Sequence, residues 1–303
     1  MESNLHVRKH INSHKQFGLN YGITNNIGKV RQNDIRKILD KAAKLGVKHL
    51  DTAPSYGCGK AELLIGEFSK NKIIVNTKIG NNERKIKSFK IKDLNISIEK
   101  SLKRLKRDSI NVLFLHNPRI SISKLDKLVY FLIQLKKEKI IKKSGISLPK
   151  NFKIPFSILN EFDVVQDDLN LLKLDQLKNN FKNFHARSPL ASGLLSGRRI
   201  SLKRFSKKND HRKEWLDKKR LKHLKIQISK IEKFNSKSLH RLSRKIILQQ
   251  ENVNKVVFGV RNKIQIKDIL KDKKFVPYTK AMQKKIFTLY IDNEYSKNHK
   301  LNY

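Results

Sequence analysis

The segment HLDTAPSY (49–56) combines a short apolar run with a carboxylate at Asp51 and a phenol at Tyr56. Two later apolar runs also end on a titratable side chain, because IIVNTK ends at Lys78 and VLFLH ends at His116. In a parallel α/β barrel, the catalytic groups lie at the carboxyl ends of the strands. We therefore predict that these four side chains meet at one rim of a barrel and that the chain is an enzyme.

Short apolar runs alternate with stretches of helical periodicity along the chain. A first helix is predicted to begin near Asn33 and to end at Gly46, which suits a left-handed C-cap. Further helices are predicted at residues 60–68, 94–105, 123–138, 221–231 and 238–249, with a brief one within 151–160. Strands are predicted at residues 48–53, 72–79, 110–115, 140–147, 162–166, 184–188 and 255–258.

With the glycine-bearing run FGLNYG (17–22) counted first, this pattern contains eight strand–helix units. Strands separated by helical crossovers form a parallel sheet, and eight such strands make a barrel. We therefore predict a single-domain α/β fold over residues 1–303, a (β/α)8 TIM barrel with a core at about 16–271 and a C-terminal extension at 272–303. The alternative is two domains, but no Gly/Pro/Ser-rich linker divides the sequence.

The chain has no feature that predicts export or membrane insertion. No apolar stretch approaches the roughly 20 residues that a bilayer-spanning helix needs, and the first ten residues lack the apolar segment of a secretory signal. The single cysteine, Cys58, excludes an internal disulfide and suits a reducing compartment. We expect a cytoplasmic protein.

The formal net charge is +43, from 69 basic and 26 acidic residues. Such a field attracts nucleic acid, anionic lipid surfaces or phosphorylated ligands. However, Lys greatly outnumbers Arg, and Asn and Ile are also plentiful, which is the composition that an A/T-rich coding sequence produces. The basic residues are spread along the chain without the interleaved aromatics that stack on bases. We therefore expect no specific nucleic-acid partner and no membrane partner, only nonspecific binding to polyanions at low salt.

The four strand-end residues suit the reduction of a carbonyl group. Hydride attack at carbon requires a proton for the oxygen, and a free phenol with a pKa of about 10 is a poor acid at neutral pH. A neighbouring ammonium such as Lys78 stabilises the phenolate of Tyr56, and a carboxylate such as Asp51 holds that ammonium charged. His116 can orient the carbonyl and donate a hydrogen bond to the developing oxyanion.

Each of the four residues also has a structural interpretation when it is taken alone. Asp51 could cap a helix, Tyr56 could pack a loop beside Pro54, and Lys78 is one of many lysines. His116, before Asn-Pro, could be a structural histidine. Their joint position at the ends of three successive predicted strands favours the catalytic interpretation.

These motifs resemble those of the aldo-keto reductase family, over about residues 16–271. The matching segments are GVKHLDTAPSYG (46–57), ELLIGE (62–67), LKRLKRDSINVLFLH (102–116), SPLASGLLSG (188–197) and VNKVVFG (253–259). Three further segments are similar to a bacterial subgroup linked to surface-polysaccharide or sugar metabolism: QFGLNYG (16–22), DVVQDDLNLL (163–172) and HARS (185–188).

The resemblance implies a metal-free reductase that binds NADPH or NADH. It assigns acid/base catalysis to Tyr56, tuning of that phenol to Asp51 and Lys78, and positioning of the carbonyl to His116. It also implies contacts to the nicotinamide carboxamide, the pyrophosphate and the adenosine phosphate end of the cofactor. Ser147 and Gln166 would contact the nicotinamide carboxamide. Ser188, Leu190, Gly193 and Leu194 would contact the pyrophosphate. Gly259, Arg261, Gln265 and Asp268 would contact the adenosine phosphate end.

The sequence departs from the family pattern at several cofactor positions. Leu148 replaces a common Asn, and Arg187 replaces an aromatic that often stacks on the nicotinamide. Gln265 stands where a basic residue is usual, and Ile269 stands where an Asn would hold the adenine. Arg261 could meet a 2′-phosphate instead, since a guanidinium suits phosphate oxygens. The family and the positive field favour NADP over NAD.

Three alternatives remain open from the sequence. A non-catalytic, nucleotide-binding regulatory protein on the same barrel would explain the departures, and a nucleic-acid-binding protein would explain the charge. In an aldolase or isomerase, Lys78 could instead form a Schiff base. The predicted substrate is a small carbonyl compound. Asp167 and Asp168, just past the predicted sixth strand, could bind sugar hydroxyls, although a solvated loop pair is the simpler expectation.

Overall fold

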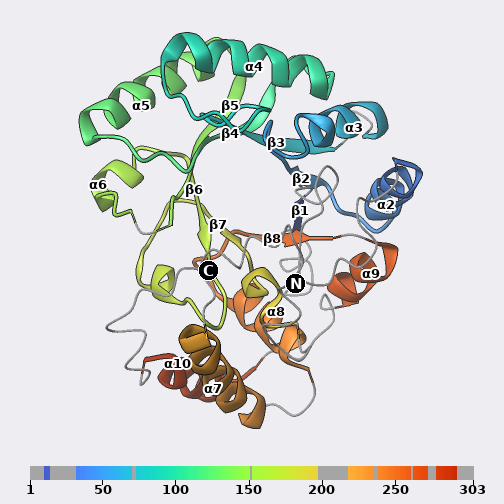
Figure 1. The fold of residues 1–303 in the computed structure, drawn as a ribbon, viewed down its shortest axis with the longest axis vertical. Helices are drawn as coiled ribbons and strands as arrows, with labels where there is room; N and C mark the ends of the chain where they lie inside the picture. The colour runs from blue at the N-terminus through green and yellow to red at the C-terminus, as the bar shows by residue number, and fades with distance from the viewer. Residues whose placement is uncertain are drawn as a thin grey trace.

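The computed structural model describes residues 10–13, 32–69, 73–150, 152–196, 218–234, 238–260, 262–271 and 278–291. Within these residues, eight parallel strands form a closed barrel in chain order (Figure 1). They are β1 (His10–Ser13), β2 (His49–Asp51), β3 (Ile74–Ile79), β4 (Ile110–His116), β5 (Ile141–Ser147), β6 (Val164–Asp168), β7 (Phe184–Arg187) and β8 (Lys255–Gly259). The predicted (β/α)8 TIM barrel is confirmed.

Strand β1 closes the barrel because it pairs with both β2 and β8. Asn12 lies opposite Leu50 of β2 and opposite Phe258 of β8. This strand lies earlier in the chain than the run at 17–22, and residues 17–22 fall outside the described part of the structure. The predicted position of the first strand is therefore wrong, since residues 10–13 already fill the place between β2 and β8.

Helices surround the barrel in the outer layer seen in Figure 1. They are α2 (Gln32–Lys44), α3 (Lys60–Phe68), α4 (Ile91–Leu105), α5 (Ile122–Lys137), α6 (Phe156–Leu159), α7 (Lys218–Phe234), α8 (Leu239–Gln249), α9 (Lys263–Lys271) and α10 (Lys280–Ile291), with 3-10 turns η1 (Asp175–Lys178) and η2 (Ala191–Gly193). Helix α10 belongs to the predicted C-terminal extension. Its Ile286 is buried in an apolar cluster that α7 and α8 share.

Helix α2 shows how the apolar pattern produces this layer. Ile35, Ile38 and Ala42 recur at three and four positions and are buried against the barrel, while the opposite side of the helix is exposed. The helix ends before Gly46, whose φ of 79° lies in the left-handed region that glycine adopts without strain. The predicted helix and its stop signal are confirmed.

A buried polar network joins α3 and α4 to β3, which is the strand that carries Lys78. The carboxylate of Glu62 on α3 accepts hydrogen bonds from Thr77 Oγ1 of β3 (2.5 Å) and from Arg104 Nε of α4 (2.8 Å). The two helices approach closely, because a Cβ at Gly66 would overlap the carbonyl oxygen of Arg104. The Glu and Gly of the ELLIGE motif therefore fix α3 against its neighbours.

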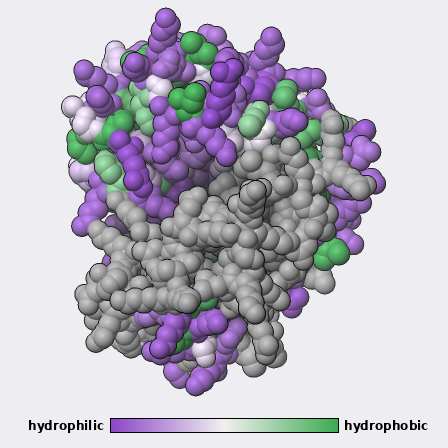
Figure 2. All heavy atoms as spheres, in the orientation of Figure 1, coloured by the Kyte–Doolittle hydropathy of each residue, from purple (hydrophilic) through white to green (hydrophobic). Residues whose placement is uncertain are grey.

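The described surface is mainly hydrophilic. On the face shown in Figure 2, purple side chains predominate over α4 and α5, and hydrophobic residues are scattered among them. Among the helices that the structure describes, none is both long enough and apolar enough to cross a membrane.

Candidate active site

The carboxylate of Asp51 and the ammonium of Lys78 form a buried ion pair at the ends of β2 and β3. Lys78 Nζ lies 2.5 Å from Asp51 Oδ1 and donates a second hydrogen bond to the carbonyl oxygen of Thr52 (2.8 Å). Both side chains are almost wholly inaccessible to solvent. Burial lowers the pKa of Lys78 from its ordinary value, and the charge of Asp51 opposes that decrease.

Tyr56 and His116 lie beside this ion pair. Lys78 Nζ is 5.3 Å from the centroid of the Tyr56 ring. The rings of Tyr56 and His116 meet edge to face, with centroids 6.1 Å apart and an interplanar angle of 84°. The structure therefore brings together all four residues that we predicted to meet at one rim.

Phe114 also lines this site, and sequence reasoning missed it. Lys78 Nζ lies 5.7 Å from the centroid of its ring, within the range of a cation–π contact. A Cβ at Gly145 would overlap the same ring, so the glycine on β5 leaves the space that Phe114 needs. The available signal was spacing, because residues two apart on a strand share a face and Phe114 precedes His116 by two.

Ser147 and Gln166, the predicted carboxamide contacts, extend the polar network from the catalytic carboxylate. Gln166 Nε2 donates to Asp51 Oδ2 (3.0 Å), and Ser147 Oγ donates to Gln166 Oε1 (3.0 Å). The two side chains are buried on neighbouring strands, with Ser147 opposite Gln166 in the β5–β6 register.

Arg187, at the end of β7, reaches into the same network. Its guanidinium group donates four hydrogen bonds and forms an ion pair with a fifth oxygen acceptor. The acceptors are Asp168 Oδ1 (2.8 Å), Leu148 O (2.7 Å), Ser147 Oγ (2.7 Å), Asn117 Oδ1 (3.4 Å) and Asp167 Oδ1 (3.5 Å). The side chain that replaces the family's aromatic is therefore fixed in one plane beside Ser147. The sequence did not predict the contact with Asn117.

Asp167 and Asp168 are not a solvated loop pair, so that expectation is wrong. Both belong to β6, are 3% and 4% exposed, and bind Arg187, while Lys173 binds Asp167 as well. Burial alone would lower the pKa of Arg187, but Asp168 and Asp167 hold that pKa above its ordinary value. Burial would likewise raise the pKa of Asp168, but Arg187 holds it below its ordinary value. These carboxylates are occupied by cations, which also removes the support for hydroxyl binding.

The predicted pyrophosphate segment follows β7 and has an unusual backbone. Ser188 has a φ of 55° and Gly193 a φ of 93°, both in the left-handed region. The N–H groups of Gly193 and Leu194 donate to the carbonyl oxygens of Leu190 and Ala191. The side chain of Leu194 is buried in the second apolar cluster, and Leu190 packs against that cluster. The side chain of Leu194 therefore does not line a ligand site, and its backbone N–H is bonded within the segment.

The predicted adenosine end lies after β8. Gly259 ends that strand and is exposed, the backbone N–H of Gln265 donates to Asn262 Oδ1 (2.9 Å), and Ile269 is buried in the core. Arg261 lies outside the described residues. Asp268 points toward α8, where its carboxylate binds Arg244 (2.8 Å), Arg241 (3.2 Å) and His240 (3.5 Å).

A closed parallel barrel that carries an acid, a phenol, an amine and an imidazole at one rim defines the class as a (β/α)8 barrel enzyme scaffold. The chain matches the model of the aldo/keto reductase family over residues 16–291, so it belongs to that family of oxidoreductases.

One curated relative is also named an oxidoreductase, and solved structures share the fold. The uncharacterized oxidoreductase YqkF of Bacillus subtilis (strain 168) is 31% identical over 185 residues, which cover 54% of this chain. The match spans 58% of the length of that relative. Among solved structures, the glycerol dehydrogenase AKR11B4 of Gluconobacter oxydans has a TM-score of 0.75 at 22% identity, over 94% of this chain and 91% of its own. The holo form of aldo-keto reductase AKR11C1 from Bacillus halodurans has a TM-score of 0.73 at 21% identity, over 93% and 91%.

Proposed function

We propose that this protein uses NADPH, or NADH, to reduce an aldehyde or ketone to an alcohol, with Tyr56 as the proton donor. The observation that carries the proposal is the position of Lys78 Nζ, 2.5 Å from the Asp51 carboxylate and 5.3 Å from the centre of the Tyr56 ring. We also propose a cytoplasmic location, because the single cysteine, Cys58, is free and exposed.

These contacts explain how Tyr56 could transfer a proton to the carbonyl oxygen of the substrate. Asp51 keeps the buried ammonium of Lys78 charged against the cost of burial, and the charged Lys78 stabilises the Tyr56 phenolate. Tyr56 therefore gives its proton to the carbonyl oxygen more readily than an isolated phenol would. The proton that is lost is replaced from solvent after each turnover.

His116 and Phe114 form the walls around the reacting atoms. The imidazole of His116 contacts the Tyr56 ring at its edge, so it can donate a hydrogen bond to the same carbonyl oxygen. Phe114 covers Lys78 and helps to exclude water from its ammonium. A low-dielectric site strengthens both interactions.

The cofactor supplies the hydride when it is bound. Ser147 and Gln166 would hold its carboxamide, the backbone of 188–194 its pyrophosphate, and Gly259, Arg261, Gln265 and Asp268 its adenosine end. NADP is our preferred form, because the net charge of +43 favours the additional phosphate. The similarity to a sugar-linked subgroup and a structural neighbour named glycerol dehydrogenase support a hydroxylated substrate such as a sugar derivative.

Cofactor titration tests the proposal first. We expect NADPH, and more weakly NADH, to quench the fluorescence of Trp215 and the tyrosines in a saturable manner at micromolar concentrations and physiological salt. Absence of quenching by both cofactors would contradict the proposal.

Tyr56→Phe tests the proton donor. We expect the variant to lose carbonyl reduction, by about 10²- to 10⁴-fold, because the general acid is removed. Its cofactor affinity should stay within about twofold, since the ring itself is retained. Tyr130→Phe, at an exposed tyrosine on α5, is the matched control and should keep full activity. An active Tyr56→Phe variant would mean that the proton donor is misassigned.

A second candidate is a non-catalytic, nucleotide-binding protein on the same barrel. The observation that favours it is Arg187, whose Nη1 donates to Ser147 Oγ (2.7 Å) where the family carries a stacking aromatic. This candidate predicts saturable cofactor quenching together with no turnover of any aldehyde, ketone or sugar in a broad substrate screen. Turnover that Tyr56→Phe abolishes would exclude it.

A further inference from the structure

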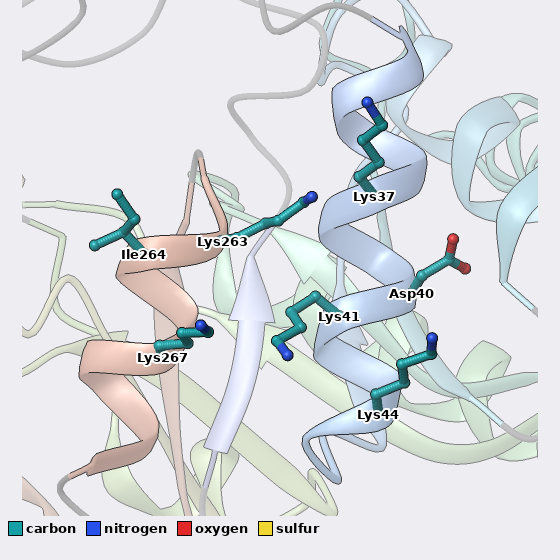
Figure 3. A pocket seen from close by; sticks show the side chains of 7 residues that line it. All are labelled: Lys37, Asp40, Lys41, Lys44, Lys263, Ile264 and Lys267. Carbon is teal, nitrogen blue, oxygen red and sulfur yellow. The ribbon is translucent and has the colours of Figure 1, made fainter.

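A lysine-lined cavity lies between α2 and α9, in the helix layer outside the barrel. Its volume is about 560 Å³ (Figure 3). Three of the lining residues are lysines of α2 and two are lysines of α9, with one acidic and one apolar residue besides. Among the residues that the structure describes, the lining consists of Lys37, Lys41, Lys44, Lys263, Lys267, Asp40 and Ile264.

Helix periodicity gathers these lysines. Lys37, Lys41 and Lys44 recur at four and three positions along α2, and Lys263 and Lys267 are four apart on α9, so each set shares one face. Buried residues on both helices, including Ile38 and Ile266, attach them to the same core and set the two lysine faces side by side. Like charges at this spacing destabilise a helix slightly, so the arrangement carries a cost that an anion would remove.

Three of the five lysine side chains point into the gap. In Figure 3, Lys41 extends from α2 toward α9, and Lys263 and Lys267 extend from α9 toward α2. Asp40, the one carboxylate among the described lining residues, points away from the gap, and Lys44 extends on the same side of α2 as Asp40. Across the described parts of the chain, none of the five lysines forms an ion pair with a carboxylate.

Size and chemistry identify the class of ligand. A cavity of about 560 Å³ falls in the range of small-molecule sites, and it is much larger than one phosphate group requires. Lysine ammonium groups act as point charges that suit phosphate oxygens, while their aliphatic stems form apolar walls. We propose that this groove binds a small, soluble molecule that carries several phosphate groups.

The groove is separate from the proposed cofactor path. Asp268 is a proposed adenosine contact on α9, and its carboxylate faces α8, where it binds Arg244 at 2.8 Å. The groove lies on the side of α9 that faces α2. The proposed ligand and the cofactor therefore occupy different faces of the same helix, and the inference does not depend on the proposed reductase activity.

Binding of inorganic tripolyphosphate to the full chain, followed by calorimetry at 150 mM salt, tests this inference. We expect saturable binding of one molecule per chain and at least a tenfold loss of affinity in the double variant Lys41→Glu/Lys267→Glu. The matched control is Lys124→Glu/Lys127→Glu, at exposed positions on α5, which changes the net charge equally. At this salt, charges beyond about 8 Å are largely screened, so the control should bind within twofold of the unmodified protein.

Several outcomes would overturn the inference. Equal loss of affinity in both double variants would assign binding to the overall charge, and absence of tripolyphosphate binding would remove the site. Displacement of tripolyphosphate by saturating NADPH, with the affinity for tripolyphosphate unchanged in Lys41→Glu/Lys267→Glu, would place it in the cofactor site instead. Binding of anionic vesicles by a protein that does not bind tripolyphosphate would identify a membrane surface as the partner. Thermal unfolding of each variant verifies that it is folded.

Discussion

Asp51→Asn tests the charge relay with the smallest change in shape. The amide can keep the hydrogen bond from Gln166 Nε2, which is 3.0 Å long in the structure, but it removes the negative charge 2.5 Å from Lys78 Nζ. Burial already lowers the pKa of Lys78, and Asp51 is the main opposing charge. The pKa of Lys78 should therefore fall further in the variant, and more of the amine should be neutral at neutral pH.

The expected magnitudes follow from this loss of charge. A neutral amine no longer stabilises the Tyr56 phenolate, so kcat for carbonyl reduction should fall by about 10²- to 10⁴-fold, the range of a general acid/base contribution. Removing one partner of a buried ion pair costs about 3–5 kcal/mol of folding free energy if the other partner stays charged. Because the pKa of Lys78 is lower in the folded than in the unfolded chain, the stability deficit should shrink as pH rises toward about 10.4, the ordinary lysine value.

Steady-state kinetics and urea unfolding between pH 6 and 10 would measure both effects. Asp126→Asn, at an exposed position on α5, is the matched control and should change neither quantity. The alkaline limb of the kcat profile should move to higher pH in Asp51→Asn, since the phenol becomes a weaker acid. Unchanged kcat, or a stability deficit that grows with pH, would refute the reasoning.

Two further predictions concern side chains around the site. Arg187→Leu leaves the buried carboxylates of Asp167 and Asp168 without their arginine, so urea unfolding should show a loss of about 3–5 kcal/mol at pH 7. Arg187 holds the pKa of Asp168 below its ordinary value, so this deficit should shrink as pH falls below about 4 and should not shrink if Arg187 is merely a packing residue. Gly66→Ala should destabilise the fold by about 1–3 kcal/mol in the same assay, because its Cβ would overlap the Arg104 carbonyl oxygen; an unchanged midpoint would show that α3 and α4 can separate freely.

Local sequence predicted those parts of the fold that depend on periodicity. The apolar spacing of α2 predicted a helix that buries one face, and the apolar run of β4 predicted a strand that is buried on both faces. The alternation of such helices and strands predicted the barrel. The positions of Lys78 and His116 at the ends of their strands were enough to predict that the two side chains meet, since parallel strands end at the same rim. The first strand was misplaced because its four residues, His10–Ser13, have no alternating pattern, and their pairing is with strands that lie far away in the sequence.

Side-chain pairing between strands could not be predicted in this way. The two carboxylates of β6 look like loop residues because their charge is costly to bury, and Arg187 on the next strand, with Lys173 beside Asp167, makes that burial possible. Whether an arginine faces the barrel interior depends on the register of β7 against β6, where Asp168 lies opposite Arg187. That register is a property of the folded sheet. The position of Arg187 also determines whether Ser147 and Gln166 keep hydrogen-bonding groups for a cofactor.

A count of hydrogen-bonding capacity bears on that question. Ser147 Oγ gives its proton to Gln166 Oε1 and accepts one bond from Arg187, which leaves it one lone pair. Gln166 uses one amide proton on Asp51 and one lone pair on Ser147, which leaves one donor and one acceptor. A nicotinamide carboxamide needs an acceptor for its N–H group and a donor for its carbonyl oxygen, and both remain without breaking any bond to Arg187. The arginine that replaces the family's aromatic is therefore compatible with a bound cofactor, which both candidates require, and turnover of a carbonyl substrate is the measurement that separates them.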